Sequence, residues 1–422
     1  MIKRIVLYSL LFTSLLSVSA YAGTDDETAY ALNTLLFLVS GFLVMLMAAG
    51  FCMLESGMVT SKSVSTIAAK NIGLYSIAGI MFWVIGYNVA YGIPEGGYIG
   101  SFTPWSDASA IDTGYSDGSD WFFQMVFCAT TVSIVSGTLA ERIKIWPFFL
   151  FAAILTGIIY PIEMGWQWGG GWLSAAGFSD FAGSTLVHAA GGAAALAGAI
   201  VLGPRLGRFS NGKLVPFASS SIPLATLGTF ILWFGWFGFN GGSQLALAGF
   251  ENATAVATIY INTNLAACAG VMTCAVITRL INGKTDVIMM LNGALGGLVA
   301  ITAEPLTPTP LMAIIIGSIG GIIVILGTQA LNKFQIDDVV GAIPVHLFAG
   351  IWGTLAVPLT NSGTSFGPQL LGTASICAFV FVVSFIVWSI MKATIGIRIS
   401  EEAEKEGTDI AETGVTAYAI RD

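Results

Sequence analysis

The chain has only two histidines, and both lie at the same position of a repeated pattern. The segment Asp180-Phe-Ala-Gly-Ser-Thr-Leu-Val-His188 matches Asp338-Val-Val-Gly-Ala-Ile-Pro-Val-His346 at its Asp, Gly, Val and His positions. Helical spacing places each histidine about 12 Å beyond its aspartate, close to the middle of a membrane if the helix spans one. An imidazole can donate one hydrogen bond and accept another, so the pair could offer hydrogen bonds to a molecule that crosses apolar surroundings.

Three interpretations of the histidine pair are open. It could be a hydrogen bond that only packs two helices together, a bis-imidazole ligand set for haem, or the lining of a pore. Polar side chains at the centre of a membrane are costly unless they are partnered or functional. Small residues follow His188, in the run Ala189-Ala-Gly-Gly-Ala193, and let helices approach closely. We therefore favour a pore-lining pair, with no cofactor and no metal.

The two aspartates of the repeat, Asp180 and Asp338, most simply cap the helices that carry the histidines. A carboxylate accepts hydrogen bonds from the free N–H groups of a first helical turn. Asp180 lies at the expected entrance to its span, so it could also add negative potential there.

Aromatic residues gather in neighbouring segments. Phe123 and Phe127 are four residues apart, Trp168 precedes three glycines, and Trp236-Phe-Gly-Phe239 follows. One interpretation is an aromatic belt at the membrane interface. The sharper interpretation is a set of rings that binds an entering cation, an interaction worth up to about 2 kcal/mol when desolvated.

The composition requires a membrane protein. Charged residues make up 9% of the 422 residues and hydrophobic residues 55%. Because soluble proteins carry roughly 25% charged residues, this chain cannot cover a water-facing surface. The net charge of −8 excludes binding to nucleic acid. We expect an all-α polytopic membrane protein.

Apolar runs long enough to cross a bilayer recur along the chain. The spans are predicted near 31–54, 68–92, 121–140, 146–165, 182–203, 222–242, 254–281, 286–303, 309–330, 340–358 and 368–392. The two histidine units are five spans apart, so the second runs through the membrane in the opposite direction. We therefore predict eleven transmembrane helices, arranged as a 5+5 inverted repeat plus one extra helix, around a path at the midplane.

Loop charges give the orientation. With eleven spans, every Lys and Arg beyond residue 22 falls beside an odd-numbered connection or in the last segment of the chain. Because cytoplasmic loops are enriched in these residues, we predict an inner-membrane protein with its N-terminus outside and its C-terminus in the cytoplasm.

The first residues resemble a secretory signal. Lys3 and Arg4 precede an apolar stretch, and Ala20-Tyr-Ala22 is a typical cleavage site. The alternative is a short first transmembrane helix. We predict a cleaved signal peptide over 1–22, a membrane domain over 23–395 and a cytoplasmic tail over 396–422. The five cysteines lie in apolar segments without metal-ligand spacing, so we expect them to be packing residues.

Four motifs together resemble the ammonium transporter (Amt/Mep/Rh) family, in particular its Amt-type bacterial members. They are Asp180-Phe-Ala-Gly…His188, Ala140-Glu-Arg142, Trp236-Phe-Gly-Phe-Asn240 and Asp337-Asp338…Val345-His346. The resemblance implies a homotrimer with one ammonium or ammonia path through each protomer, no enzymatic activity, and loss of a proton at the outer side.

The resemblance also implies roles for single residues. Phe127 and Phe239 look like a stacked pore gate, and His188 and His346 look like the twin histidines of the pore. Trp168, Ser243 and Phe127 look like the outer substrate-binding site for ammonium. Phe123 and Trp236 match aromatic residues of its vestibule, and Asp180 matches the acidic residue beneath it.

Two departures from the family pattern bear on the inner pore and the tail. Leu347 and Phe348 follow the second histidine where glycine is usual, and Pro344 predicts a local bend. The acidic tail is expected to contact a cytosolic P-II signalling protein, although Thr413-Gly-Val415 replaces the usual His-Gly-Glu element.

Two alternative functions use the same scaffold. One is an ammonium sensor, which we rank lower because roughly 27 residues follow the last predicted span, too few to fold an output domain. The other is an Rh-like neutral ammonia channel, disfavoured by Trp168.

Overall fold

The computed structural model describes residues 24–418, so the predicted signal peptide lies outside the described residues. Within that range nine helices are long and apolar enough to cross a membrane, and two shorter apolar helices, Val287–Thr302 and Ile343–Leu359, complete the eleven predicted segments. The predicted all-helical membrane fold is therefore confirmed.

Several of the crossing segments are built from more than one helix. In chain order they are α2 Asp26–Met58; α3 Val64–Met81, η2 Phe82–Gly86 and α4 Tyr87–Tyr91; α5 Asp117–Thr138; α6 Ile145–Ile154, η4 Leu155–Ile159 and α7 Tyr160–Gly165; η5 Ser184–Ala189 and α9 Ala190–Leu202; α10 Ile222–Gly242; α11 Phe250–Asn282; α12 Val287–Thr302; α13 Pro310–Lys333; η6 Ile343–Phe348, α14 Ala349–Ala356 and η7 Val357–Leu359; and α15 Phe366–Thr394. The connections contain η3 Ile111–Thr113, α8 Trp172–Ala175 and the hairpin of β1 Phe209–Ser210 and β2 Lys213–Leu214, and α16 Glu401–Glu406 and η8 Asp409–Thr413 follow α15.

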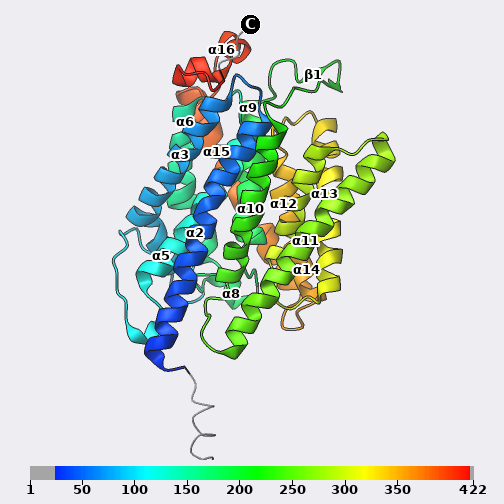
Figure 1. Ribbon diagram of the computed structural model, residues 1–422. Helices are drawn as coiled ribbons and strands as arrows, with labels where there is room; N and C mark the ends of the chain where they lie inside the picture. Colours follow the sequence, from blue (N-terminus) through cyan, green and yellow to red (C-terminus); the bar gives the residue numbers. More distant parts are fainter. Residues whose placement is uncertain (1–23, 419–422) are drawn as a thin grey trace, which may run out of the picture.

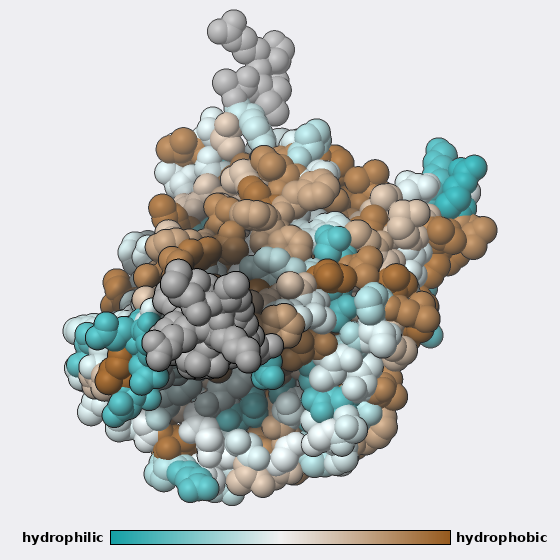
Figure 2. Space-filling view, turned by 60° about the horizontal axis from the view of Figure 1, so that its bottom comes forward, coloured by the Kyte–Doolittle hydropathy of each residue, from teal (hydrophilic) through white to brown (hydrophobic). Residues whose placement is uncertain are grey.

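The long helices run side by side between two ends of the molecule (Figure 1). We call the end with α16 the tail end and the opposite end, with α8, the α8 end. Figure 2 shows a mostly hydrophobic flank, whereas pale and hydrophilic residues gather on the α8 end that is turned forward. This distribution is typical of a bundle whose sides face lipid.

Glycines bring α2 and α10 into close contact. A methyl group added at Gly57 would lie 2.3 Å from the backbone nitrogen of Ala225, and one at Gly228 would lie 2.2 Å from that of Leu54. Only glycine fits at such crossings, which is how helices pack tightly in a membrane without a hydrophobic driving force.

The two histidine units have the same local backbone. Each begins with a left-handed glycine, Gly183 at φ 102° and Gly341 at φ 81°, and continues as a π-helical turn, η5 or η6. The aspartate before each glycine accepts backbone N–H groups of that turn, which confirms the predicted caps. These shared features support the inverted repeat.

The departures beside His346 have little effect on this backbone. The η5 turn is π-helical without a proline, so Pro344 is not needed for the irregular turn of η6. Leu347 packs on Gly192 of α9, where an added methyl group would lie 2.5 Å from the Leu347 nitrogen. Its bulk is therefore accommodated by a neighbouring glycine.

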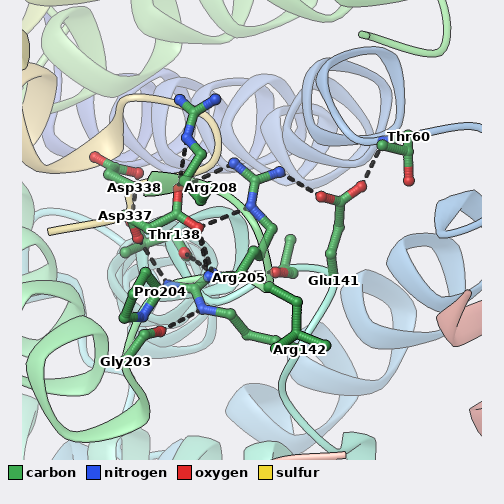
Figure 3. Close-up of polar contacts among 12 residues, drawn as sticks. Thr60, Thr138, Glu141, Arg142, Gly203, Pro204, Arg205, Arg208, Asp337 and Asp338 are labelled. Atoms are coloured by element: carbon green, nitrogen blue, oxygen red, sulfur yellow. Dashed lines mark hydrogen bonds and ion pairs between the residues drawn. The ribbon is translucent and has the colours of Figure 1, made fainter. Parts of the chain in front are cut away.

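A buried ion cluster joins three connections at the tail end (Figure 3). The Nε of Arg205 lies 2.8 Å from Oδ2 of Asp337, and a second nitrogen of Arg205 pairs with Glu141. Arg142 donates to the carbonyl of Asp337 at 2.7 Å, and Nε of Arg208 lies 3.3 Å from Oδ1 of Asp337. Burial acts to raise the pKa of Asp337, but the bonds and charge of Arg205 and Arg142 outweigh it and hold the pKa below its usual range.

The segment after α15 packs against the same end of the bundle. Ile143 and Arg398 form an antiparallel bridge, and Arg398 pairs with Glu404 at 2.8 Å. Asp409 accepts hydrogen bonds from the backbone nitrogens of Val64 and Thr66, so it caps the start of α3. Arg398 also donates to the carbonyls of Leu202 and Pro204, so the tail is tied to three connections of the bundle.

Candidate functional site

An aromatic pocket of about 340 Å³ lies at the α8 end, and it contains four of the predicted site residues. We call it the aromatic pocket; it is lined by Tyr87, Tyr91, Tyr115, Asp120, Phe123, Gln124, Phe127, Trp168, Phe181, Ser243 and Leu245. The spacing of Asp120, Phe123, Gln124 and Phe127 on α5 places them on one face of that helix. The pocket therefore combines ring faces with a carboxylate.

Asp120 is a pocket residue that the sequence analysis missed. Its two oxygens accept hydrogen bonds from Tyr87 at 2.7 Å and from Gln124 at 3.0 Å. The signal that could have revealed it is its spacing of three and seven residues from the two phenylalanines of the pocket. A fixed carboxylate among aromatic rings is suited to attract a small cation.

Trp168 is oriented by the loop that contains Asp180. Its indole nitrogen donates to the backbone carbonyl of Asp180 at 2.9 Å, and its ring meets Phe127 edge to face, with centroids 5.9 Å apart. The carboxylate of Asp180 is fully buried and accepts four backbone N–H bonds, from residues 183–186. Asp180 is therefore placed as a helix cap beneath the pocket and is not among the pocket-lining residues.

Phe127, which lines the aromatic pocket, is paired with Phe239 of α10. Their rings stack with centroids 3.9 Å apart and an interplanar angle of 25°. Ser243, which follows the last residue of α10, donates its hydroxyl to the Phe239 carbonyl at 2.9 Å. The lone pairs of this hydroxyl thus stay free to accept a bond from a donor in the pocket.

The two histidines meet directly beyond this stack. Nδ1 of His188 and Nδ1 of His346 are 3.2 Å apart, and both side chains are buried. The His188 ring also stacks on Phe239, with centroids 5.2 Å apart. An iron between the two nitrogens would need about 2 Å to each, which this spacing does not leave, so the geometry argues against the haem interpretation.

Trp236 lies deeper than its predicted place in the vestibule. Its indole nitrogen donates to Thr302 at 2.8 Å, and this bond holds the ring in a stack on His188 with centroids 4.8 Å apart. It supports the first histidine and does not line the aromatic pocket.

A second, much smaller space lies on the other side of the histidines. We call it the His346 cavity; its volume is about 10 Å³, roughly the room that one water molecule needs. His346 lines it together with Phe51 and Glu55 of α2, and the Phe51 and His346 rings lie 6.1 Å apart. The order along this axis is therefore aromatic pocket, phenylalanine stack, His188, His346 and His346 cavity.

The polar groups of the site are few, and the carboxylate stands apart from the imidazoles. Across residues 24–418, no group of three or more His, Cys, Asp or Glu is placed to hold a metal ion. What remains is a narrow path with aromatic rings and one carboxylate at one end and imidazoles in the middle. Such a path suits a small hydrogen-bonding molecule.

Comparisons with known proteins agree with this geometry. Residues 35–418 match the Ammonium Transporter Family. The chain is 41% identical to ammonium transporter Amt2 of Archaeoglobus fulgidus, over 90% of this chain and 87% of the relative. It is 38% identical to a putative ammonium transporter of Synechocystis sp., over 97% of this chain and 94% of that one.

Solved structures share the fold. A protein titled "Sensor Amt Protein" superposes with a TM-score of 0.87 at 34% identity, covering 92% of this chain and all of that one. Mep2 of Candida albicans superposes with a TM-score of 0.82 at 27% identity, covering 93% and 92%. By the extent of these matches, the chain is a member of the ammonium transporter family, of the Amt type.

Proposed function

We propose that this protein transports ammonium, taking it up at the aromatic pocket and passing it as ammonia along the buried histidine pair. The observation that carries the proposal is the 3.2 Å contact between His188 and His346 directly beneath the Phe127–Phe239 stack. A pair of imidazoles at this depth has no structural necessity in an apolar bundle, and it offers hydrogen bonds where the walls offer none.

The aromatic pocket supports recognition of the cation. Ammonium entering it would meet the carboxylate of Asp120, the ring faces of Phe127 and Trp168, and the hydroxyl of Ser243. Phe123 adds a further ring and packs on Phe127 with centroids 4.7 Å apart. Cation–π contacts in such a desolvated place are worth up to about 2 kcal/mol.

The phenylalanine stack favours loss of a proton before passage. Taking a bare monovalent ion into an apolar interior has an idealised cost on the order of 20 kcal/mol. The rings that pack against the stacked pair, those of Phe123, Trp168, Trp236 and His188, carry no negative charge that could compensate the ion there. Ammonium can release its proton at the pocket and continue as neutral ammonia, whereas potassium cannot, and this is the proposed basis of selectivity.

The histidines would then provide hydrogen bonds to the neutral molecule. With both rings neutral, one Nδ1 donates and the other accepts across the 3.2 Å contact. Protonating both rings would place like charges side by side in a low dielectric, so at most one ring is charged at a time.

We propose that the tail end faces the cytoplasm of an inner-membrane protein. In the described residues, Arg142, Arg205 and Arg208 lie in tail-end connections, whereas the connections at the α8 end contain no Lys or Arg. The positive-inside rule supports this orientation. The proposal includes cleavage after residue 22, a membrane domain over 23–395 and a cytoplasmic tail over 396–422. Accessibility of single cysteines placed in loops from either side of intact cells tests it.

We propose further that the protein is a homotrimer and that its tail contacts a P-II signalling protein. An apolar groove of about 660 Å³ between α2 and α3, lined by Phe42, Met45 and Leu46 among others, offers a surface for a helix of a second copy. The acidic tail lies beside basic connections, and these charges support a contact with the P-II protein. Native mass spectrometry tests the trimer, and a pull-down with the cognate P-II protein tests the tail contact.

A sensor is the second candidate, because the solved structure titled "Sensor Amt Protein" shares this fold. An Rh-like ammonia channel is less well supported, because Trp168 lines the pocket where a cation would bind. Proteoliposomes on a solid-supported membrane separate the three: a transporter of the proposed kind gives a current with ammonium and none with potassium. Uptake without current indicates a neutral channel. The absence of both uptake and current indicates a sensor.

A further inference from the structure

We propose that Glu55 is the residue that returns a proton to ammonia at the exit of the pore. This inference rests on the proposed function and adds a residue to it. Glu55 lies on α2, within a membrane-spanning helix, and only 1% of its surface is exposed. A carboxylate that is withdrawn from water in this way is expensive unless it is compensated.

The first support is the position of Glu55 in the His346 cavity. Of the thirteen residues that line this cavity, only Glu55 and His346 can exchange protons. Because the space holds about one water-sized molecule, an ammonia leaving His346 lies within reach of both side chains. Phe51, one turn before Glu55, packs near the imidazole, so α2 borders the cavity with both side chains.

The second support is the asymmetry of the two Glu55 oxygens. Oε2 accepts hydrogen bonds from Ser136 at 2.7 Å and from Asn71 at 3.1 Å. Oε1 is buried and has no partner among the described residues. One oxygen therefore anchors the side chain, and the other is left for a proton or for a molecule in the cavity.

The third support is a compensating charge behind the anchored oxygen. Lys70 of α3 donates to the backbone carbonyl of Ser136 at 2.7 Å, and its ammonium lies 5.1 Å from the centre of the Phe148 ring. Ser136 thus links the lysine to the carboxylate. A nearby cation stabilises the anion that remains after Glu55 has given up its proton.

The proposed step balances in atoms and charge. The O–H bond of the Glu55 carboxyl breaks, its proton joins the lone pair of ammonia, and ammonium and the Glu55 carboxylate result. The carboxylate then regains a proton through the histidine pair, which passes on the proton released at the aromatic pocket. The charged and titratable groups near Glu55 are Lys70 from α3, His346 from η6 and the Cys52 thiol of its own helix. The polar Asn71, Ser136 and Asn292 lie around them.

Glu55→Gln is the decisive variant. Its amide oxygen can accept both bonds of Oε2 while the proton-exchanging group is removed. We expect the ammonium-evoked current in proteoliposomes to fall at least about tenfold, and to decline further as the internal pH rises, because water must then supply the proton. Glu55→Asp, which keeps a carboxyl group, should recover part of the current.

Two further variants separate proton transfer from a structural role. Glu55→Gln with Lys70→Met removes both charges, and it should keep the low current. Glu304→Gln removes a buried carboxylate that binds the backbone of Leu306 and Thr307 outside the cavity, and it should behave as wild type.

Wild-type current and an unchanged pH profile in Glu55→Gln would overturn the proposal, and so would recovery of full current in the double variant. If Glu55→Gln does not assemble, Glu55→Asp and the charge-neutral double variant decide in the same way. An absence of current in the wild type would instead defeat the proposed function.

Discussion

The turn with His188 and the turn with His346 have the same backbone conformation and differ in what surrounds them. Both are π-helical, follow a left-handed glycine and are capped by an aspartate. The first lies beneath an aromatic pocket of about 340 Å³ with a carboxylate in its wall. The second opens on a cavity of about 10 Å³. The repeat therefore provides two equal supports for imidazoles, and their surroundings make one side an entrance for a cation and the other an exit for a small neutral molecule.

The two turns are also held in place differently. The cap of the first, Asp180, is bonded only to its own turn and supports Trp168 through its carbonyl. The cap of the second, Asp338, also accepts from Thr138 of α5 and follows Asp337 of the ion cluster. Damage to the cluster should therefore reach His346 before it reaches His188.

The largest expected effect comes from removing both imidazoles. His188→Leu with His346→Leu should abolish the ammonium-evoked current, because the path then loses both imidazoles between the phenylalanine stack and the His346 cavity. Each single variant should lose nearly as much, so the two losses should be strongly non-additive. Full, ammonium-selective current in the double variant would mean that the histidines only pack.

Breaking the ion cluster beside the His346 turn should lower the stability of the folded protein. Arg205→Gln leaves the buried Asp337 and Glu141 without their main cation, and it should cost about 3–5 kcal/mol of stability. The measurement is the thermal unfolding of the purified protein. As a matched control, Lys405→Gln removes an exposed pair with Glu401 and should leave the melting temperature unchanged.

The pH dependence of the same variant follows from Asp337. The pKa of Asp337 in the folded protein is held below the ordinary carboxyl value of about 3.9. The stability that the ionised Asp337 contributes is therefore fully present above that value. The contribution is lost as the pH falls through the lower folded pKa. The difference in melting temperature between wild type and Arg205→Gln should therefore shrink in acid, and a constant difference would contradict the role of Asp337.

Removing the indole of the aromatic pocket should have a smaller effect, on binding. Trp168→Leu should shift the ammonium concentration for half-maximal current by roughly tenfold, since up to about 2 kcal/mol of cation–π energy is lost. The melting temperature should change little. An unchanged concentration dependence and selectivity would count against cation binding at Trp168.

The smallest expected effect is that of Asp120→Asn. The amide can still accept from Tyr87 or Gln124, so the pocket should keep its shape while losing its charge. We expect the half-maximal concentration to rise several-fold, and the rise should be reduced at high ionic strength. An effect equal to that of Trp168→Leu at high salt would point to structural damage.

The sequence predicts most of the fold because membrane spans are long apolar runs that end at polar residues, glycine or proline. Eleven segments were expected, and η5 with α9 begins at Ser184 where the prediction was 182. The histidine repeat predicts that His188 and His346 meet, because the spacing from aspartate to histidine is the same in both units. Pro344 was expected to bend its turn, yet the equivalent turn without a proline is equally π-helical, so the repeat geometry and not the proline determines it.

The sequence predicts less where a position depends on packing between distant segments. Trp236 was assigned to the vestibule, but its bond to Thr302, sixty-six residues away, places it on His188. Asp120 and Glu55 were missed for the same reason: each lies just beyond an end of a predicted span, where an acidic residue is ordinary, and the partners Tyr87 and Ser136 lie on other helices.

The most direct test of the central claim compares ammonium-evoked and potassium-evoked currents in the wild type and in His346→Asp. The account predicts a wild type that conducts with ammonium alone, because the phenylalanine stack that the substrate must pass is apolar and the imidazoles beyond it are neutral. It predicts that a carboxylate in the middle of the path can hold a bare cation, so His346→Asp conducts with potassium as well. A wild type that conducts with potassium, or an active His346→Asp that still excludes it, would contradict the account.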